Sequence, residues 1–220
     1  MTECRNRFSA LAIGALVLTG LISFSGTAKA TTLGFTCIEG GTLCTNVQNQ
    51  FSLMITDGGT YATIQVDNAG PTASVITDMF AYDPNGVFNG YVGSPWTDTG
   101  VSFGTTGAPP ALPGDGSYDD WGVWAANPSP TNGIGAGESL TYMLSYSTGI
   151  SFTDINNALA NGTLGFGLHV QSVAPTGGSI SLVSKIPDIP QTPVPEPTTY
   201  LLTGVGLVGL GMARRYRKSA

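Results

Sequence analysis

Short runs of alternating apolar and polar residues, separated by turn residues, dominate the middle of this 220-residue chain. In Phe51–Ile55 and Tyr61–Asp67 every second residue is apolar, and Asp57-Gly58-Gly59 separates the two runs. A period of two places alternate side chains on opposite faces of a β-strand, so this pair predicts a β-hairpin.

Further runs of this kind raise the number of expected strands to about eight. They cover Val75–Tyr82, Val87–Val92, Val101–Gly104, Leu140–Tyr146, Leu164–Val170 and Ile180–Leu182. The 31 glycines supply turn residues between them. We therefore predict an all-β fold, an antiparallel β-sandwich or jelly roll.

Two segments depart from the strand pattern. Thr153 can cap one short helix over Asp154–Ala160, and Asn161-Gly162 provides its stop signal. Gly104–Gly137 contains five prolines and has little alternation, so we expect a long loop there.

The first thirty residues have the pattern of a signal peptide. Arg5 and Arg7 precede the apolar run Phe8–Ile22, and Ala28-Lys29-Ala30 fits the small-x-small rule for cleavage. The apolar run is short for a permanent membrane anchor. We expect residues 1–30 to be removed and the secreted form to begin at Thr31.

The two cysteines that remain after this cleavage, Cys37 and Cys44, predict a disulfide bond, because an even pair in an exported protein is usually oxidised. Gly40-Gly41 lies between them and suits a tight hairpin that brings the thiols together. Metal binding is the alternative, but two cysteines without a nearby histidine make a poor zinc site.

The C-terminal segment has three successive parts. Five prolines between Pro187 and Pro197 favour an extended stalk. The uncharged stretch Thr198–Ala213 predicts a single short membrane-spanning helix, and a positive cluster follows it, which favours a cytoplasmic end. The cluster consists of Arg214, Arg215, Arg217 and Lys218. The expected organisation is thus a signal peptide over residues 1–30, a β core over 31–186, a stalk over 187–197 and a membrane tail over 198–220.

This tail resembles the PEP-CTERM sorting signal. The resemblance rests on Pro195-Glu196-Pro197, on the short hydrophobic stretch and on the basic end of the chain. It implies that a membrane protease-transpeptidase, the exosortase, recognises and cleaves the tail. It also implies a Gram-negative host that makes exopolysaccharide.

Charge excludes nucleic acid as a partner. The net charge is −6, and between residues 31 and 195 Lys185 is the single cation against twelve carboxylates. Binding to phosphates needs clustered Lys and Arg, and this stretch has no such cluster.

Catalytic signatures are missing from the sequence. His169, the single histidine, alternates with apolar neighbours, so we expect it to face solvent from a strand. No Gly-x-Ser-x-Gly elbow and no Walker or dinucleotide fingerprint is present. We expect no enzyme activity and no cofactor, with an enzyme acting on polysaccharide as the third-ranked alternative.

The irregular middle of the chain leaves two groups of side chains open to interpretation. Asp115, Asp119 and Asp120 could be a solvated loop, a calcium site or half of a catalytic carboxylate pair. Trp96, Trp121 and Trp124 could pin the loop to the core or stack on sugar rings. The overall expectation is an exported surface or matrix protein, held briefly in the inner membrane, with a structural or binding role in the exopolysaccharide or biofilm matrix. The alternative is a carbohydrate-binding module.

Overall fold

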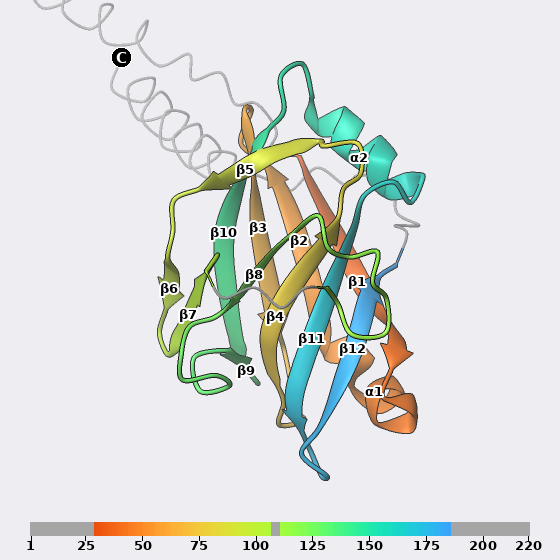
Figure 1. Ribbon diagram of the computed structural model, residues 1–220, viewed down its shortest axis with the longest axis vertical. Coiled ribbons are helices and arrows are strands. Elements are labelled where there is room, and N and C mark those ends of the chain that lie inside the picture. Colours follow the sequence, from red (N-terminus) through yellow and green to blue (C-terminus); the bar gives the residue numbers. More distant parts are fainter. Residues whose placement is uncertain (1–28, 107–110, 186–220) are drawn as a thin grey trace, which may run out of the picture. The chain divides into compact units, whose positions relative to one another are not determined.

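The computed structural model describes residues 29–106 and 111–185, which form an antiparallel β-structure with two short α-helices (Figure 1). Residues 1–28 of the predicted signal peptide lie outside the described residues. The predicted stalk and membrane-spanning tail lie outside them as well. Within the described ranges, no helix has the length and hydropathy needed to cross a membrane.

The predicted strands are all present, and four more appear in the described part of the chain. The elements are β1 Ala30–Glu39, α1 Gly41–Val47, the 3-10 turn Gln48–Gln50, β2 Phe51–Asp57, β3 Tyr61–Asn68, β4 Val75–Tyr82, β5 Phe88–Val92, β6 Trp96–Asp98, β7 Val101–Gly104, β8 Trp121–Ala125, β9 Ile134–Gly135, β10 Glu138–Tyr146, α2 Phe152–Ala160, β11 Gly165–Val173 and β12 Gly178–Ser184. The predicted hairpin is β2–β3, with Ile55 opposite Ile64. The unpredicted strands are β1, β6, β8 and β9.

The strands form one curled antiparallel sheet in the order β5-β10-β3-β2-β1-β12-β11-β4-β8-β7-β6, with β9 on β4. Strand β1 joins the two halves of this sheet. Its first part, Ala30–Gly34, pairs with β2, and its second part, Phe35–Glu39, pairs with β12. A strand that changes partners in this way makes a corner, so the two halves face each other across one core. The predicted all-β antiparallel architecture is confirmed.

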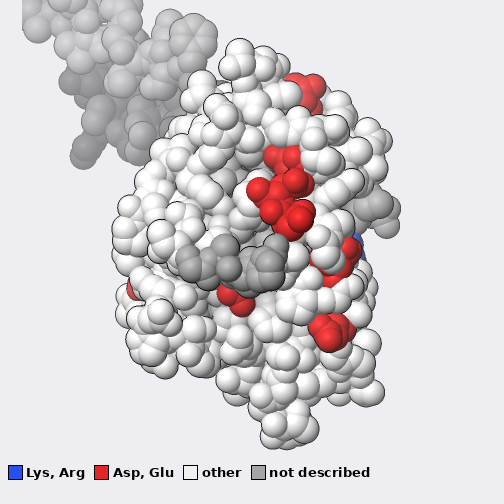
Figure 2. All heavy atoms as spheres, viewed as in Figure 1, with Lys and Arg blue, Asp and Glu red and all other residues white. Residues whose placement is uncertain are grey.

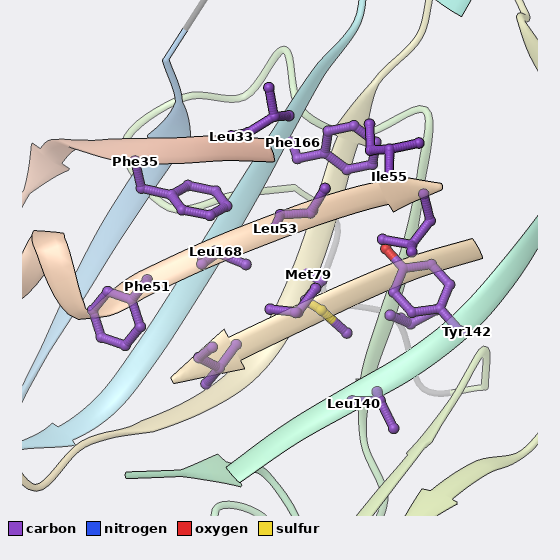
Figure 3. Packing of buried hydrophobic residues seen from close by; sticks show 14 of the residues in the cluster. Leu33, Phe35, Phe51, Leu53, Ile55, Met79, Leu140, Tyr142, Phe166 and Leu168 are labelled. Carbon is purple, nitrogen blue, oxygen red and sulfur yellow. The ribbon is translucent and has the colours of Figure 1, made fainter. Parts of the chain in front are cut away.

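The core consists of the inward-facing residues of both halves (Figure 3). β2 and β3 alternate buried and partly exposed residues along their length, as a sheet with one covered face requires. The labelled core residues in Figure 3 are Leu33, Phe35, Phe51, Leu53, Ile55, Met79, Leu140, Tyr142, Phe166 and Leu168. α2 lies at one end of the curled sheet and adds Phe152, Ile155, Ala158 and Leu159 to the buried set.

Helix α2 begins two residues before the predicted start, so the predicted cap Thr153 is wrong. Ser151 is the N-cap, in an extended conformation, and its hydroxyl accepts a hydrogen bond from the backbone N–H of Asp154. The Asp154 carboxylate accepts from the Ser151 backbone N–H at 2.8 Å, which completes a capping box. The predicted stop is confirmed, because Asn161 is the C-cap and Gly162 has a φ of 69°.

The Cys37–Cys44 disulfide is confirmed, but the hairpin expected around it is not. β1 ends at Glu39, and Gly41 starts α1, so the bond ties a strand to a helix. Gly40 makes the reversal at a φ of 103°, where a Cβ would also lie 2.5 Å from Ile180 Cγ2. Glycine is therefore required by both the backbone conformation and the close approach.

The segment predicted as one long loop contains two strands. β8 pairs with β4, with Trp124 opposite Asp78 and Trp121 opposite Ala81, and β9 pairs with the start of β4. Before β8, residues 111–120 cross the outer face of β11, and we call this segment the strap. A Cβ on Gly167 would lie 2.6 Å from Leu112 Cδ2, so the glycine makes room for the strap.

Candidate functional site

The tryptophans considered for sugar stacking do not form an exposed row. Trp96 is 7% exposed, and its ring centroid lies 5.6 Å from that of Tyr142 in the core. Trp121 is partly buried and packs edge-on against three other aromatic rings. Trp124 is also partly buried, and its Nε1 donates to the carbonyl of Thr106 at 2.6 Å. Trp96 and Trp121 therefore pack in and against the core, and Trp124 holds the chain after β7.

One buried polar atom in this aromatic cluster, Tyr142 Oη, lacks a hydrogen-bond partner among the described residues. Burial raises the pKa of Tyr142 far above its ordinary value. Tyr91 differs, because its hydroxyl donates to the carbonyl of Gly122 at 2.6 Å, while burial raises its pKa to about 12. The cluster is thus an aromatic core with one unpaired hydroxyl among the described residues.

The three aspartates considered for calcium have separate contacts in the described structure. Asp115 Oδ1 accepts from the backbone N–H and the hydroxyl of Ser117, at 3.1 and 2.6 Å. The Asp120 carboxylate accepts from the backbone N–H of Asp83, and Asp119 is exposed. Across residues 29–106 and 111–185, no group of three or more His, Cys, Asp or Glu side chains could hold a metal ion. Among the described residues, these three aspartates do not come together as a group of possible calcium ligands.

Asp83 anchors the turn between β4 and β5. Burial raises the pKa of its carboxyl, and the nearby Asp120 carboxylate raises it further. Hydrogen bonds from the backbone N–H groups of Val87 and Phe88, at 2.9 and 3.1 Å, and a hydrogen bond from the Trp121 side chain lower this pKa. The contacts of Asp83 indicate a structural turn.

Figure 2 shows acidic side chains spread along this face of the molecule.

A row of polar side chains crosses four neighbouring strands on the outer face of the sheet. Glu39 of β1 pairs with Ser181 of β12, Ser181 pairs with His169 of β11, and His169 pairs with Asp78 of β4. His169 Nδ1 lies 3.4 Å from Ser181 Oγ, and Ser181 Oγ lies 3.4 Å from Glu39 Oε2. His169 is therefore half-buried inside a polar row, where the sequence predicted a residue facing solvent.

The chemistry open to this row is limited by burial. Ser181 has no exposed surface, so its hydroxyl offers no face to a substrate. Burial raises the pKa of Asp78, while a hydrogen bond from Thr77 Oγ1 at 2.8 Å and the charge of His169 lower it. The local sequence does not predict this row, because only the register between strands brings its members together. As arranged, the row links β1, β12, β11 and β4 and does not form a nucleophilic triad.

The predicted sorting motif, Pro195, Glu196 and Pro197, lies outside the described residues. The basic residues Arg214, Arg215, Arg217 and Lys218 lie outside them as well. For the sorting motif and the basic residues, the comparison with known protein families gives a result. The description of the family that matches residues 193–218 is "PEP-CTERM protein-sorting motif". No curated protein and no solved structure matches the chain.

The β core and the C-terminal motif together define an exported β-protein with a separate sorting segment. More specifically, the chain carries a PEP-CTERM sorting domain. Such a protein is sorted by the exosortase system and is held in the membrane before it is processed. The resemblance expected from the sequence is thereby confirmed.

Proposed function

We propose that this exported protein is a structural or binding component of the exopolysaccharide matrix, at the cell surface or outside the cell. The observation that carries the proposal is the PEP-CTERM motif over residues 193–218. The motif implies a delivery route, and the β core is the part of the chain that the route would deliver. Binding of exopolysaccharide, rather than its chemical conversion, is the role we assign to that core.

Features of the described core support a role without catalysis. Its single histidine contacts a serine hydroxyl that has no exposed surface. The Cys37–Cys44 bond and the capped helix α2 stabilise a small domain that has to persist outside the cell. The described core carries Lys29 and Lys185 against eleven carboxylates, which supports an uncharged rather than an anionic glycan as its neighbour.

The sorting part of the proposal is tested by changing Glu196. Glu196→Ala should leave membrane insertion intact and block recognition, so full-length protein accumulates in the inner membrane. Asp188→Ala removes a carboxylate from the same proline-rich segment outside the matched motif, and it should be processed normally. Fractions of the native host are probed with antibodies to the core and to a tag placed after Ala220. A tag that remains on mature wild-type protein at the cell surface would contradict processing.

The matrix part is tested in a host strain that makes no exopolysaccharide. If the mature core is held by this polymer, it should move from the cell-associated fraction into the medium when the polymer is absent. The measurement is the ratio of core antibody signal in the two fractions, with an outer-membrane protein as the control for cell loss. Equal retention of the core in both strains would contradict binding to the exopolysaccharide. It would not affect the proposed sorting route.

A further inference from the structure

The expected signal-peptide cleavage point falls inside a strand of the folded core. The pattern Ala28-Lys29-Ala30 places the scissile bond between Ala30 and Thr31, and β1 begins at Ala30. Ala30 is paired with Thr56 of β2. No free linker therefore separates the bond from the sheet.

The register shows which backbone groups around this bond are occupied. The backbone N–H of Asp57 donates to the carbonyl of Lys29 at 2.8 Å. In an antiparallel ladder this bond makes Ala30–Thr56 a non-hydrogen-bonded pair, so Thr31 exchanges both of its backbone hydrogen bonds with Ile55. β2 thus holds the Lys29 carbonyl, one residue before the scissile bond, and the Thr31 N–H of the scissile bond itself.

Freeing the bond would open the core. Thr31 is 8% exposed, and its hydroxyl donates to Asn156 of α2. Leu33 and Phe35, further along β1, are each 1% exposed. A protease binds its substrate as an extended segment through backbone hydrogen bonds, which β1 can offer only after it separates from β2. Because β1 joins the two halves of the sheet, that separation breaks up the fold.

We propose that the Ala30–Thr31 bond is hydrolysed only before β1 pairs with β2, so that folding of the core ends the period in which the signal peptide can be removed. Hydrolysis adds one water, leaving a carboxylate on Ala30 and an α-ammonium on Thr31. The product keeps the Thr31–Ile55 pair, because the new ammonium still donates to the Ile55 carbonyl. It loses the Lys29–Asp57 bond at the extreme end of the strand. The mature core therefore folds like the uncut one, and the order of the two events decides whether the signal is lost. This proposal is independent of the matrix role.

The test measures cleavage of the full-length precursor by signal peptidase in detergent micelles. Denatured precursor is diluted into peptidase either at once or after refolding with the disulfide formed. Mass spectrometry follows the fragment that begins at Thr31. We expect cleavage after refolding to be at least about tenfold slower than cleavage at the moment of dilution. In a stable fold only a small fraction of the molecules has β1 separated from the sheet at any time, and only those molecules can be cleaved.

Two variants separate folding from sequence recognition. An insert of about twelve Gly and Ser residues, led by Thr and placed after Ala30, keeps the residues around the bond and moves it off the sheet. This variant should be cut equally fast in both orders. Leu33→Asp puts an unpaired charge in the core and should keep the refolded chain cleavable. The proposal is overturned if refolded wild-type precursor is cut as fast as the insert variant. It is equally overturned if freshly diluted wild-type chain yields no product that begins at Thr31.

Discussion

At the scale of single residues, burial in the sheet disfavours the ionised form of the Asp78 carboxyl. Its folded pKa is raised above the ordinary value of 3.8, so the native state binds this proton more tightly than the unfolded chain does. The stability that comes from protonated Asp78 is full below pH 3.8 and is lost as the pH rises through the higher folded pKa. Above that pKa the buried carboxylate opposes folding. Its neighbour Thr77 offsets part of this by hydrogen bonding.

Replacing Asp78 with Asn should stabilise the core at neutral pH. The amide oxygen keeps the hydrogen bond from Thr77 and removes the buried charge. We expect a gain of about 0.5 kcal/mol at pH 7 after screening of a partly exposed group, shrinking below about pH 4. Urea unfolding at both pH values measures it, with Asp119→Asn as an exposed control. A loss of stability at pH 7 would show that the charge of His169 outweighs burial.

A second residue-scale test uses the unpaired hydroxyl of Tyr142 in the core (Figure 3). Tyr142→Phe removes a buried polar group that has no partner among the described residues, so the free energy of unfolding should rise by about 1 kcal/mol. Tyr91→Phe is the matched control. It leaves the carbonyl of Gly122 without its donor and should lower stability. Chemical denaturation distinguishes the two, and destabilisation by Tyr142→Phe would point to a partner for that hydroxyl.

At the scale of elements, the capping box decides where α2 begins. Ser151→Ala should destabilise the core by about 1 kcal/mol, because the N–H of Asp154 loses its acceptor. Thr153→Ala, at the cap expected from sequence, should change stability little. Hydrogen bonds from Ser151 lower the pKa of Asp154, so the contribution of its carboxylate is present above about pH 4 and is lost as the pH falls through the lower folded value. Thermal unfolding of both variants at pH 7 and pH 3 tests the assignment, and equal effects of the two alanines would refute it.

The contact between the strap and β11 is a second element-scale feature. In Gly167→Ala the new Cβ meets Leu112, which is only 2% exposed and has little room to move. We expect a loss of about 1–3 kcal/mol from overpacking. Gly116→Ala lies in the same strap with nothing within 4 Å of its Cβ, and it serves as the control. Limited proteolysis should also show earlier cleavage within the strap in Gly167→Ala, whereas an unchanged digestion pattern would argue against the contact.

For the molecule as a whole, charge imbalance is the dominant long-range term. The described core has two lysines against eleven carboxylates, so its net repulsion should fall as salt screens it. Between low salt and about 0.5 M NaCl we expect the free energy of unfolding to rise by about 0.5–1 kcal/mol. Neutralising exposed Asp98 and Asp119 together should reduce this response. A decrease of stability with salt would instead indicate that favourable ion pairs dominate.

Local sequence was sufficient for several features that depend on near neighbours in the chain, although it misplaced the cap of α2 and missed α1. Alternation in residues 51–67 predicts the β2–β3 hairpin, two cysteines seven residues apart predict their own bond, and Asn161-Gly162 marks the end of α2. The sorting motif is also a local pattern, matched over residues 193–218. Each of these features lies within one short continuous segment of the chain, so propensity, turn chemistry and local pattern indicate it.

Tertiary structure alone decided the features that depend on strand register and on what covers a side chain. Ser181, His169 and Asp78 come from three strands, and nothing in the sequence places them in one row. The same holds for Trp96, whose ring is buried because Tyr142 of a distant strand packs against it. β8 was missed because its partner β4 lies far away in sequence, and the second half of β1 likewise pairs with the distant β12. Pairing between distant segments depends on the shape of the whole core, because a strand takes the position that buries its apolar face best, and no local pattern encodes that choice.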